Sequence, residues 1–453
     1  MSTESALPDE NKLSPEAGRV LRLAFLTLFI DLIGFSIIFP LFPAMLEYYR
    51  ARESATGLFG VLNGVLEHLA LWFGTPSRDA GITVLFGGIL GSVYSLLQFA
   101  CAPVFGSISD RYGRRPVLLI SLVGILISYG CWFFAGSFTL LVISRVIGGI
   151  MSANISTVSA IVSDVTTQKT RSRGMAVIGI AFGLGFTLGP ALGALSSFYD
   201  LSKHFPALAA YGVNPWSMAA VIAFVLTLVN LVQVILSMPE TLPRTGHLER
   251  VERSINPLKL FHTVAYPGVS RTNFAYFIFL LAFSGMEFSL TFLAHEKFGY
   301  TERQNAMLFL VIGFVLAGIQ GGYVRRRADA MGPKKMALHG LFMLIPGLVI
   351  IGLAGQLQII ALLYLGITVL AAGAAQATPC LTSLASLYAP PEEQGRIMGI
   401  FRSLGALARA GGPLVACVAY WRLGASAAYY LGAVLLLAPI ALTRTLPPVK
   451  STA

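Results

Sequence analysis

The chain has 453 residues, of which 55% are hydrophobic and only 12% are charged, and its mean hydropathy is +0.74. Soluble proteins carry about twice this fraction of charged residues, so the composition excludes an ordinary soluble domain and indicates a membrane protein. The net charge of +11 would suggest nucleic-acid binding in a soluble chain, but a membrane protein uses basic loops to orient its helices. We therefore predict no nucleic-acid partner, and the lipid bilayer is the first partner that the sequence implies.

Twelve apolar runs follow one another along the chain, and each spans about 18 to 25 residues, enough to cross a bilayer. Their centres lie near Gly34, Leu96, Ile125, Met151, Phe186, Leu226, Phe283, Phe314, Leu344, Val369, Leu407 and Val434. The predicted fold class is an all-α multi-pass membrane protein with 12 transmembrane helices in two six-helix bundles. The predicted parts are a tail over 1–21, a first bundle over 22–238, a linker over 239–270, a second bundle over 271–444 and a tail over 445–453.

The basic residues predict the orientation in the membrane. The first 20 or so residues are polar and lack a signal-peptide pattern. Loops on the side of the N-terminus carry most lysines and arginines, among them Arg111, Arg114, Arg115, Lys169, Arg271, Arg325, Lys334, Arg396 and Arg402. Positive loops stay inside, so we expect both termini in the cytosol. The sequence does not choose between the plasma membrane and an endomembrane such as the nuclear envelope or endoplasmic reticulum.

An amphipathic segment follows the first span. Over residues 55–74, apolar side chains recur at helical spacing at Leu58, Val61, Leu62, Val65, Leu69, Trp72 and Phe73. Such a stripe is typical of a helix that lies in the membrane interface. We predict an interfacial helix there, on the side opposite the termini.

A charged turn joins the second and third spans. It reads Gly106-Ser-Ile-Ser-Asp110-Arg111-Tyr-Gly113-Arg114-Arg115. The glycines let two helix ends approach closely, and the aspartate can pair with an arginine or cap a helix N-terminus. An ordinary basic loop would explain the arginines but not the ordered glycines and aspartate. We predict that this turn is a conformational latch.

The two halves of the chain repeat each other. A shift of 223 residues aligns Arg173 and Met175 with an arginine and a methionine, and it aligns Gly189-Pro190 with Gly412-Pro413. A shift of 219 residues aligns Asp110 and Gly113-Arg114-Arg115 with Asp329 and Gly332-Pro333-Lys334, and Arg325 stands at the position that matches Gly106. Such a repeat predicts two bundles related by an axis along the membrane normal, with the ligand site between them. We expect the first latch to be the stronger one.

The fifth span carries Gly185-x-x-x-Gly189-Pro190-x-x-Gly193. Small residues at this spacing permit close helix packing, and the proline interrupts the backbone hydrogen bonds to create a bend. With Gly412 and Pro413 in the second half, these residues are candidates for conformational change. Generic small-residue packing is the alternative interpretation.

Four ionisable residues lie well inside predicted spans, namely Asp31, Arg145, Glu287 and Arg409. Each costs at least about 2.5 kcal/mol to insert, so such charges indicate function by default. Two structural ion pairs, Asp31 with Arg145 and Glu287 with Arg409, are the alternative.

Their chemistry suggests roles. Surroundings of low dielectric constant favour the neutral, protonated form of a carboxyl group. Glu287 lies in an apolar stretch, so it is our first candidate for a proton carrier. Arginine offers a forked donor to an anion, and Arg409 is our first candidate for substrate binding. Uncharged candidates for substrate contact are Gln98, Gln320 and Gln376, which could instead only bond across helices.

The latch turn and the fifth-span glycines resemble motifs of the major facilitator superfamily. The first span, with Asp31, Gly34, Pro40 and Pro43, and the fourth, with Arg145-Val-Ile-Gly148-Gly149, resemble its drug:proton antiporter branch. In that branch the arginine of the fourth helix is linked to proton transfer, which adds Arg145 and Asp31 to the proton-coupling candidates. Residues 85–99, 174–179 and 402–413 are similar to animal relatives of the bacterial tetracycline efflux pumps. These animal relatives are regarded as organic-anion exporters.

The resemblance implies a secondary transporter that exports amphipathic organic anions or drugs by alternating access, as an antiporter coupled to protons. An exporter of cations or polyamine-like substrates, with Asp31 and Glu287 as the cation site, is the alternative, and a receptor or scaffold that moves nothing is a third. No nucleophile with a matching base, metal-ligand cluster or phosphate-binding loop is present in the sequence, so we predict neither an enzyme nor a cofactor nor a bound metal. One chain contains a complete cavity, so a monomer suffices.

Overall fold

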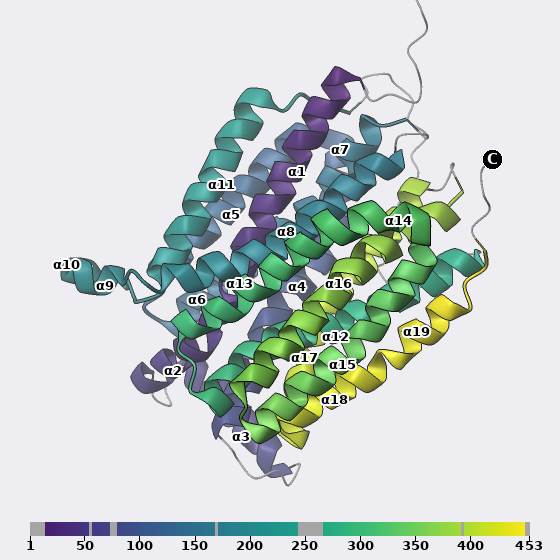
Figure 1. Ribbon diagram of the computed structural model, residues 1–453. Coiled ribbons are helices and arrows are strands. Elements are labelled where there is room, and N and C mark those ends of the chain that lie inside the picture. The colour runs from purple at the N-terminus through teal and green to yellow at the C-terminus, as the bar shows by residue number, and fades with distance from the viewer. Residues whose placement is uncertain are drawn as a thin grey trace, which may run out of the picture.

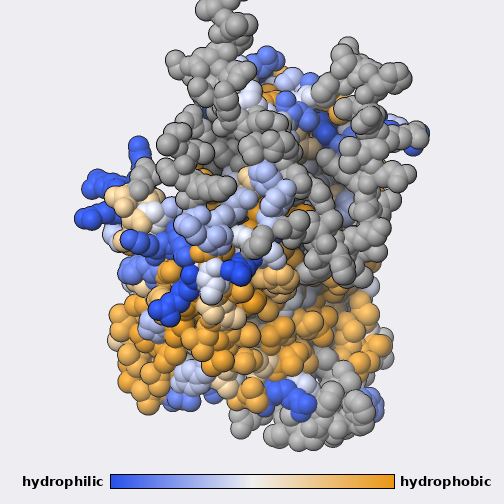
Figure 2. All heavy atoms as spheres, turned by 90° about the vertical axis from the view of Figure 1, so that its right-hand side faces the viewer, coloured by the Kyte–Doolittle hydropathy of each residue, from blue (hydrophilic) through white to orange (hydrophobic). Residues whose placement is uncertain are grey.

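The computed structural model describes residues 14–53, 57–72, 79–167, 171–242, 266–390 and 394–448. Within these ranges, twelve helices are long and apolar enough to cross a membrane, and the regular secondary structure is helical throughout. The predicted all-α fold with 12 membrane-crossing helices is confirmed. Figure 2 shows a band of apolar side chains across one face of the molecule, with polar side chains above and below it.

The first half contains six crossings, four of them built from a single long helix. The first crossing consists of α1 (Pro15–Ser36), η1 (Phe39–Leu41) and α2 (Phe42–Arg52), and the fourth consists of α6 (Phe138–Met151), η2 (Ser152–Asn154) and α7 (Ile155–Asp164). The second, third, fifth and sixth crossings are the single helices α4 (Asp79–Tyr112), α5 (Arg114–Phe133), α8 (Arg171–Ser196) and α11 (Ser217–Ser237). Short helices α3 (Leu58–Trp72), α9 (Leu201–His204) and α10 (Pro206–Ala209) lie between crossings. The helix α3 occupies the segment for which the sequence predicts an interfacial helix, and its place at the interface stays a prediction.

The second half also contains six crossings. They are α12 (Pro267–Phe298), α13 (Glu302–Gly318) with η4 (Ile319–Val324) and α14 (Arg325–Met331), α15 (Pro333–Leu357), α16 (Ile360–Tyr388), α17 (Gln394–Leu423), and α18 (Ala425–Leu435) with α19 (Leu437–Arg444). Most of the predicted linker, residues 243–265, lies outside the described residues, as do residues 1–13 and 449–453 of the tails.

Local chemistry sets where the first helix begins. The Ser14 side chain accepts a hydrogen bond from the backbone N–H of Ala17 at 3.1 Å, and Pro15 occupies the first helical position. Both features favour a helix start. The first helix therefore begins at Pro15, seven residues before position 22, the predicted start of the first bundle.

The two halves lie side by side with the same internal arrangement (Figure 1). Helix α8 packs on α1 in the first half, and α17 packs on α12 in the second. Between the halves, α4 packs on α17 and α8 packs on α13. In each contact the second crossing of one half (α4 or α13) packs on the fifth crossing of the other (α17 or α8). Such exchange symmetry is what an internal duplication produces.

The chain ends share one face of the molecule, which we call the terminal face. Arg19 in α1 donates to the carbonyl of Ser237 at the end of α11 at 3.1 Å, and Lys334 at the start of α15 donates to the carbonyl of Leu446 after α19. The short helices α2, α3, α9 and α10 lie at the other end of the crossings (Figure 1). We call that end the opposite face.

Candidate functional site

A small cavity lies between the two halves, near the middle of α4, α8, α12 and α17. It is lined by Phe35, Phe39, Gly91, Ser95, Phe186, Ser284, Glu287, Phe288, Arg409 and Pro413. Mostly apolar walls with a few convergent polar groups are typical of small-molecule sites. Another small cavity, within the second half between α12, α17 and α18, has no carboxylate, lysine, arginine or histidine in its lining, so the chemistry points to the cavity between the halves.

The acid and the base of this cavity come from neighbouring helices of the second half. Glu287 of α12 is 8% exposed, while Arg409 of α17 is half-buried. The Arg409 guanidinium lies over two rings of α8, 4.1 Å from the centroid of Phe186 and 4.7 Å from that of Phe182. Arg409 therefore reaches across the boundary between the halves.

The direct ion pair between Glu287 and Arg409, the alternative interpretation of these charges, is not formed within 4 Å, although the two charges are close enough to interact. Stacking on aromatic rings stabilises the cation by a cation–π interaction instead. The guanidinium edge is then left to interact with Glu287 or with a ligand.

The other predicted pair, Asp31 and Arg145, lies inside the first half and also forms no ion pair within 4 Å. Arg145 of α6 is 2% exposed and lies 4.5 Å from the ring of Trp132 and 5.9 Å from that of Tyr94. Asp31 of α1 is 6% exposed and interacts electrostatically with Tyr94. Tyr94 is thus a neighbour of both the acid and the base.

The Tyr94 ring also connects this buried pair with the cavity. Its centroid lies 4.7 Å from that of Phe35, which lines the cavity. A movement of ligand or helix in the cavity can therefore reach Asp31 and Arg145 through two packed rings.

The three glutamines occupy different places. Gln98 donates to the carbonyl and the hydroxyl of Ser152 at 3.0 and 3.1 Å, and Gln376 donates to the carbonyl of Ala372 at 2.9 Å and bonds with His339 at 2.8 Å. The amides of Gln98 and Gln376 thus bond between or within helices of one half, which agrees with the alternative that these glutamines only bond across helices. Gln320 lies in η4 at the contact between the halves, 3.8 Å from where a Cβ on Gly183 of α8 would be.

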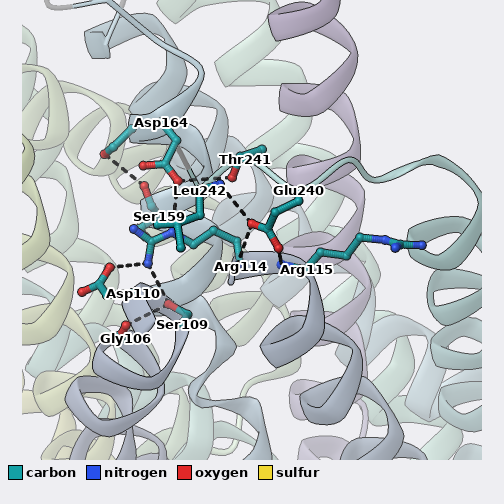
Figure 3. Close-up of polar contacts among 11 residues, drawn as sticks. Gly106, Ser109, Asp110, Arg114, Arg115, Ser159, Asp164, Glu240, Thr241 and Leu242 are labelled. Carbon is teal, nitrogen blue, oxygen red and sulfur yellow. Dashed lines mark hydrogen bonds and ion pairs between the residues drawn. The ribbon is translucent and has the colours of Figure 1, made fainter. Parts of the chain in front are cut away.

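The predicted latch turn is the centre of a polar network, drawn in Figure 3. Arg114, 5% exposed, donates from Nε to Asp164 at 3.0 Å and from Nη1 to the hydroxyl of Ser109 at 2.8 Å, and it also pairs with Asp110. The Ser109 hydroxyl donates to the carbonyl of Gly106 at 2.8 Å. These bonds join the end of α4 to the end of α7.

A second acid holds the start of α5. Glu240 accepts hydrogen bonds from the backbone N–H groups of Arg114 at 2.9 Å and Arg115 at 3.1 Å, where the helix dipole favours a negative charge. Gly113 has a φ of +105°, and a Cβ there would lie 2.6 Å from the Glu240 carboxylate. Only glycine fits this position without strain. We call Gly106, Ser109, Asp110, Gly113, Arg114, Arg115, Asp164 and Glu240 the latch network.

Besides Ser109 in the turn itself, two acidic members of the latch network, Asp164 and Glu240, are absent from the candidates chosen from sequence. Each lies next to a helix end, which is the available signal, because carboxylates there commonly pair with basic turns. Arg111, a predicted member, is instead exposed and lies over the ring of Tyr112 at 5.2 Å.

The glycines of the fifth span pack α8 directly against α1. A Cβ on Gly185 would lie 2.6 Å from that of Leu32, a Cβ on Gly189 would lie 2.8 Å from the carbonyl oxygen of Ile33, and one on Gly193 would overlap the carbonyl of Ile37. In the second half, a Cβ on Gly412 would lie 2.6 Å from the carbonyl oxygen of Leu281 in α12. Pro190 and Pro413 follow inside α8 and α17, so close packing and a proline occur together in both halves.

An aromatic plug closes the cavity toward the opposite face. The Phe288 ring lies 5.7 Å from that of Phe39, 5.3 Å from that of Phe42 and 5.7 Å from that of Phe292. Beyond it, His295 Nε2 and Glu47 Oε1 form a hydrogen bond of 3.0 Å across the two halves, which is an ion pair when the histidine is protonated. We call Phe39, Phe42, Phe288 and Phe292 the aromatic plug.

Arg402, which is predicted from sequence to be a loop charge, lies inside the fold. Arg402 is in the third turn of α17, within the membrane-crossing segment 397–423, and it is half-buried. Its spacing of seven residues from Arg409 is the signal, because it places both on one helix face.

The whole chain resembles known membrane proteins. The family model of the Major Facilitator Superfamily matches residues 24–413. The chain is 38% identical over 452 residues to major facilitator superfamily domain-containing protein 10 of Homo sapiens, covering 95% of this chain and 94% of the relative. It is 25% identical over 401 residues to the class C tetracycline resistance protein of Escherichia coli, covering 87% of this chain and 88% of the relative. The crystal structure of the human organic anion transporter MFSD10 (TETRAN) matches with a TM-score of 0.75 and 37% identity, covering 95% of this chain and 100% of that chain.

Proposed function

Because the chain belongs to the Major Facilitator Superfamily, a family of membrane transporters and not of enzymes, we propose that it exports amphipathic organic anions by alternating access. The observation that carries the proposal is Arg409, a half-buried cation on aromatic rings inside the cavity between the halves. Arginine binds carboxylates and other oxyanions through its forked donors, and the aromatic rings suit an amphipathic body. A similar human protein whose structure is known, 37% identical, is an organic anion transporter.

Coupling to protons would follow from the positions of Glu287 and Asp31. An ionised Glu287 competes with an anion for Arg409, whereas a protonated Glu287 leaves Arg409 to the anion. Net antiport requires more protons on the return step than on the anion step, so Glu287 would stay protonated on both steps. Asp31, the second buried carboxylate, would be protonated on the return step and ionised on the anion step, with Arg145 nearby to favour release of its proton. One proton then enters for each anion exported.

Alternating access would use the packing between the halves. The aromatic plug closes the cavity toward the opposite face, and transport requires it to separate. The latch network would hold the first half together as a rigid unit while the halves rock. With basic residues concentrated at the terminal face, both termini would lie in the cytosol.

The function is tested with purified protein in sealed liposomes that contain a pH-sensitive dye. An organic anion and an organic cation of matched size are added outside in separate experiments. Antiport predicts that entry of the anion expels protons, so the internal pH rises with the anion and not with the cation. A fall in pH with the anion would show that protons accompany it, which overturns antiport. A response to the cation alone would favour the alternative cation site at Asp31 and Glu287, and transport of neither ion would overturn the proposal.

A further inference from the structure

Arg402 forms part of the same aromatic contact as the proposed substrate arginine. Its guanidinium lies 5.5 Å from the centroid of Phe182 in α8 and 5.7 Å from that of Phe401 in its own helix. Arg402 thus also reaches from the second half across to the first. It lies closer than Arg409 to the start of α17 at the terminal face, by about two helical turns.

The two arginines converge on one ring. The guanidinium carbons of Arg402 and Arg409 lie 5.5 and 4.7 Å from the centroid of Phe182, so they are no farther apart than the sum of these distances, about 10 Å. Phe182 and Phe186 stack on each other with an interplanar angle of 11°. The stacked rings thus form a continuous surface that both cations share.

Gly179 lets Arg402 approach α8 closely. It lies on the same face as Phe182, and a Cβ there would lie 3.2 Å from Nη2 of Arg402. Both arginines are half-buried, so water can reach them. The Tyr276 side chain is close to both cations, which adds a neutral hydrogen-bonding group.

Two like charges at this separation repel each other in surroundings of low dielectric constant. Aromatic stacking uses the flat face of a guanidinium, whereas oxyanions bind to its N–H edge. A ligand with one anionic group can neutralise one arginine only. A ligand with two anionic groups on a rigid apolar body can neutralise both while its body lies on the rings.

We propose that Arg402 and Arg409 form a two-point site for organic dianions, in which Arg409 binds the anionic group in the cavity and Arg402 binds the second one nearer the terminal face. This inference rests on the proposed function, because it assigns a substrate class to the same cavity. It predicts that dianions with a flat aromatic body bind more tightly than the corresponding monoanions.

The test compares naphthoate with a naphthalene dicarboxylate as substrates of the full chain in liposomes. Arg402→Gln should raise the apparent KM for the dicarboxylate about tenfold, the change expected on losing one charge-assisted contact, and should change that for naphthoate less than about twofold. Arg409→Gln should weaken transport of both. Arg402→Lys, which keeps the charge but loses the fork, should give a smaller loss for the dicarboxylate.

Thermal unfolding of each variant provides the structural control. An equal loss for both substrates with Arg402→Gln, or a lower unfolding temperature with unchanged KM, would mean that Arg402 only packs the halves together, which overturns the inference. Transport of naphthoate by the unmodified protein with no preference for the dicarboxylate would also overturn it while the proposed function stands. Transport of neither would overturn both.

Discussion

At the scale of single residues, the two predicted membrane arginines are stabilised by aromatic rings and not by direct ion pairs. Arg145 lies over Trp132 and Arg409 lies over Phe186, at 4.5 and 4.1 Å. Each cation–π contact contributes about 2 kcal/mol or more where the cation is desolvated, which is comparable with the cost of at least about 2.5 kcal/mol for placing a charge in a membrane. Neither arginine therefore needs a carboxylate in direct contact.

Replacing Asp31 tests its role as proton carrier. Asp31→Asn mimics the protonated acid permanently, so a pH gradient should no longer drive accumulation of the anion, while exchange of anion across the membrane continues. Both rates are measured in liposomes with and without the gradient. Glu287→Gln, which mimics the acid that leaves Arg409 to the anion, should keep the gradient dependence, and so should the control Glu296→Gln at the end of α12, where Glu296 is bonded to Tyr420 at 2.6 Å. A joint loss of expression, stability and exchange with Asp31→Asn would instead assign Asp31 a structural role.

At the scale of helices and turns, the latch network depends on an acid supplied from a distant part of the chain. Removing Glu240 leaves the first N–H groups of α5 without their carboxylate. Glu240→Ala should therefore lower the free energy of unfolding by about 1 kcal/mol, as for other lost N-terminal caps, and Glu240→Gln should lower it less. Thermal unfolding in detergent measures both, with Glu16→Ala in the exposed first turn of α1 as the control. An equal effect at both sites would contradict a specific latch.

The packing of α8 on α1 predicts a second effect at this scale. A Cβ on Gly193 would overlap the carbonyl of Ile37, whereas one on Gly130 in α5 would have no atom within 4 Å. Gly193→Ala should destabilise the protein by about 1 to 3 kcal/mol, the usual range for overpacking, and Gly130→Ala should be neutral or slightly stabilising. The unfolding temperatures of the two variants give the comparison, and similar values would disprove the close approach of α8 and α1.

At the scale of the whole molecule, the aromatic plug and not the ion pair should keep the cavity closed toward the opposite face. The side chains of Glu47 and His295 are 58% and 39% exposed, and exposed ion pairs contribute only about 0 to 1 kcal/mol. Phe288, by contrast, is 2% exposed, and truncating a buried phenylalanine costs about 3 to 5 kcal/mol.

Labelling of a cysteine in the cavity measures this difference. In a Ser95→Cys background, Phe288→Ala should increase the rate of reaction with a membrane-impermeant thiol reagent added at the opposite face, because the plug no longer fills the path. His295→Ala should change the rate little, and the protein without the added cysteine gives the background. Faster labelling with His295→Ala than with Phe288→Ala would show that the ion pair is the main closure.

The sequence by itself determines the all-α fold with twelve crossings, because each crossing requires a long apolar run that is visible in one segment of chain. The motifs also determine the resemblance to the superfamily, which the family match confirms. The rarity of charge inside apolar spans selects Glu287 and Arg409, two residues that line the cavity. Only the tertiary structure brings Glu240 and Asp164 to the latch turn, places Arg145 on the rings of Trp132 and Tyr94, and moves Arg402 from a supposed loop to the contact with Phe182. These features depend on which helices pack together and at what depth. Packing of distant segments has no signature in the local pattern of apolar and charged residues, so it had to come from the folded chain.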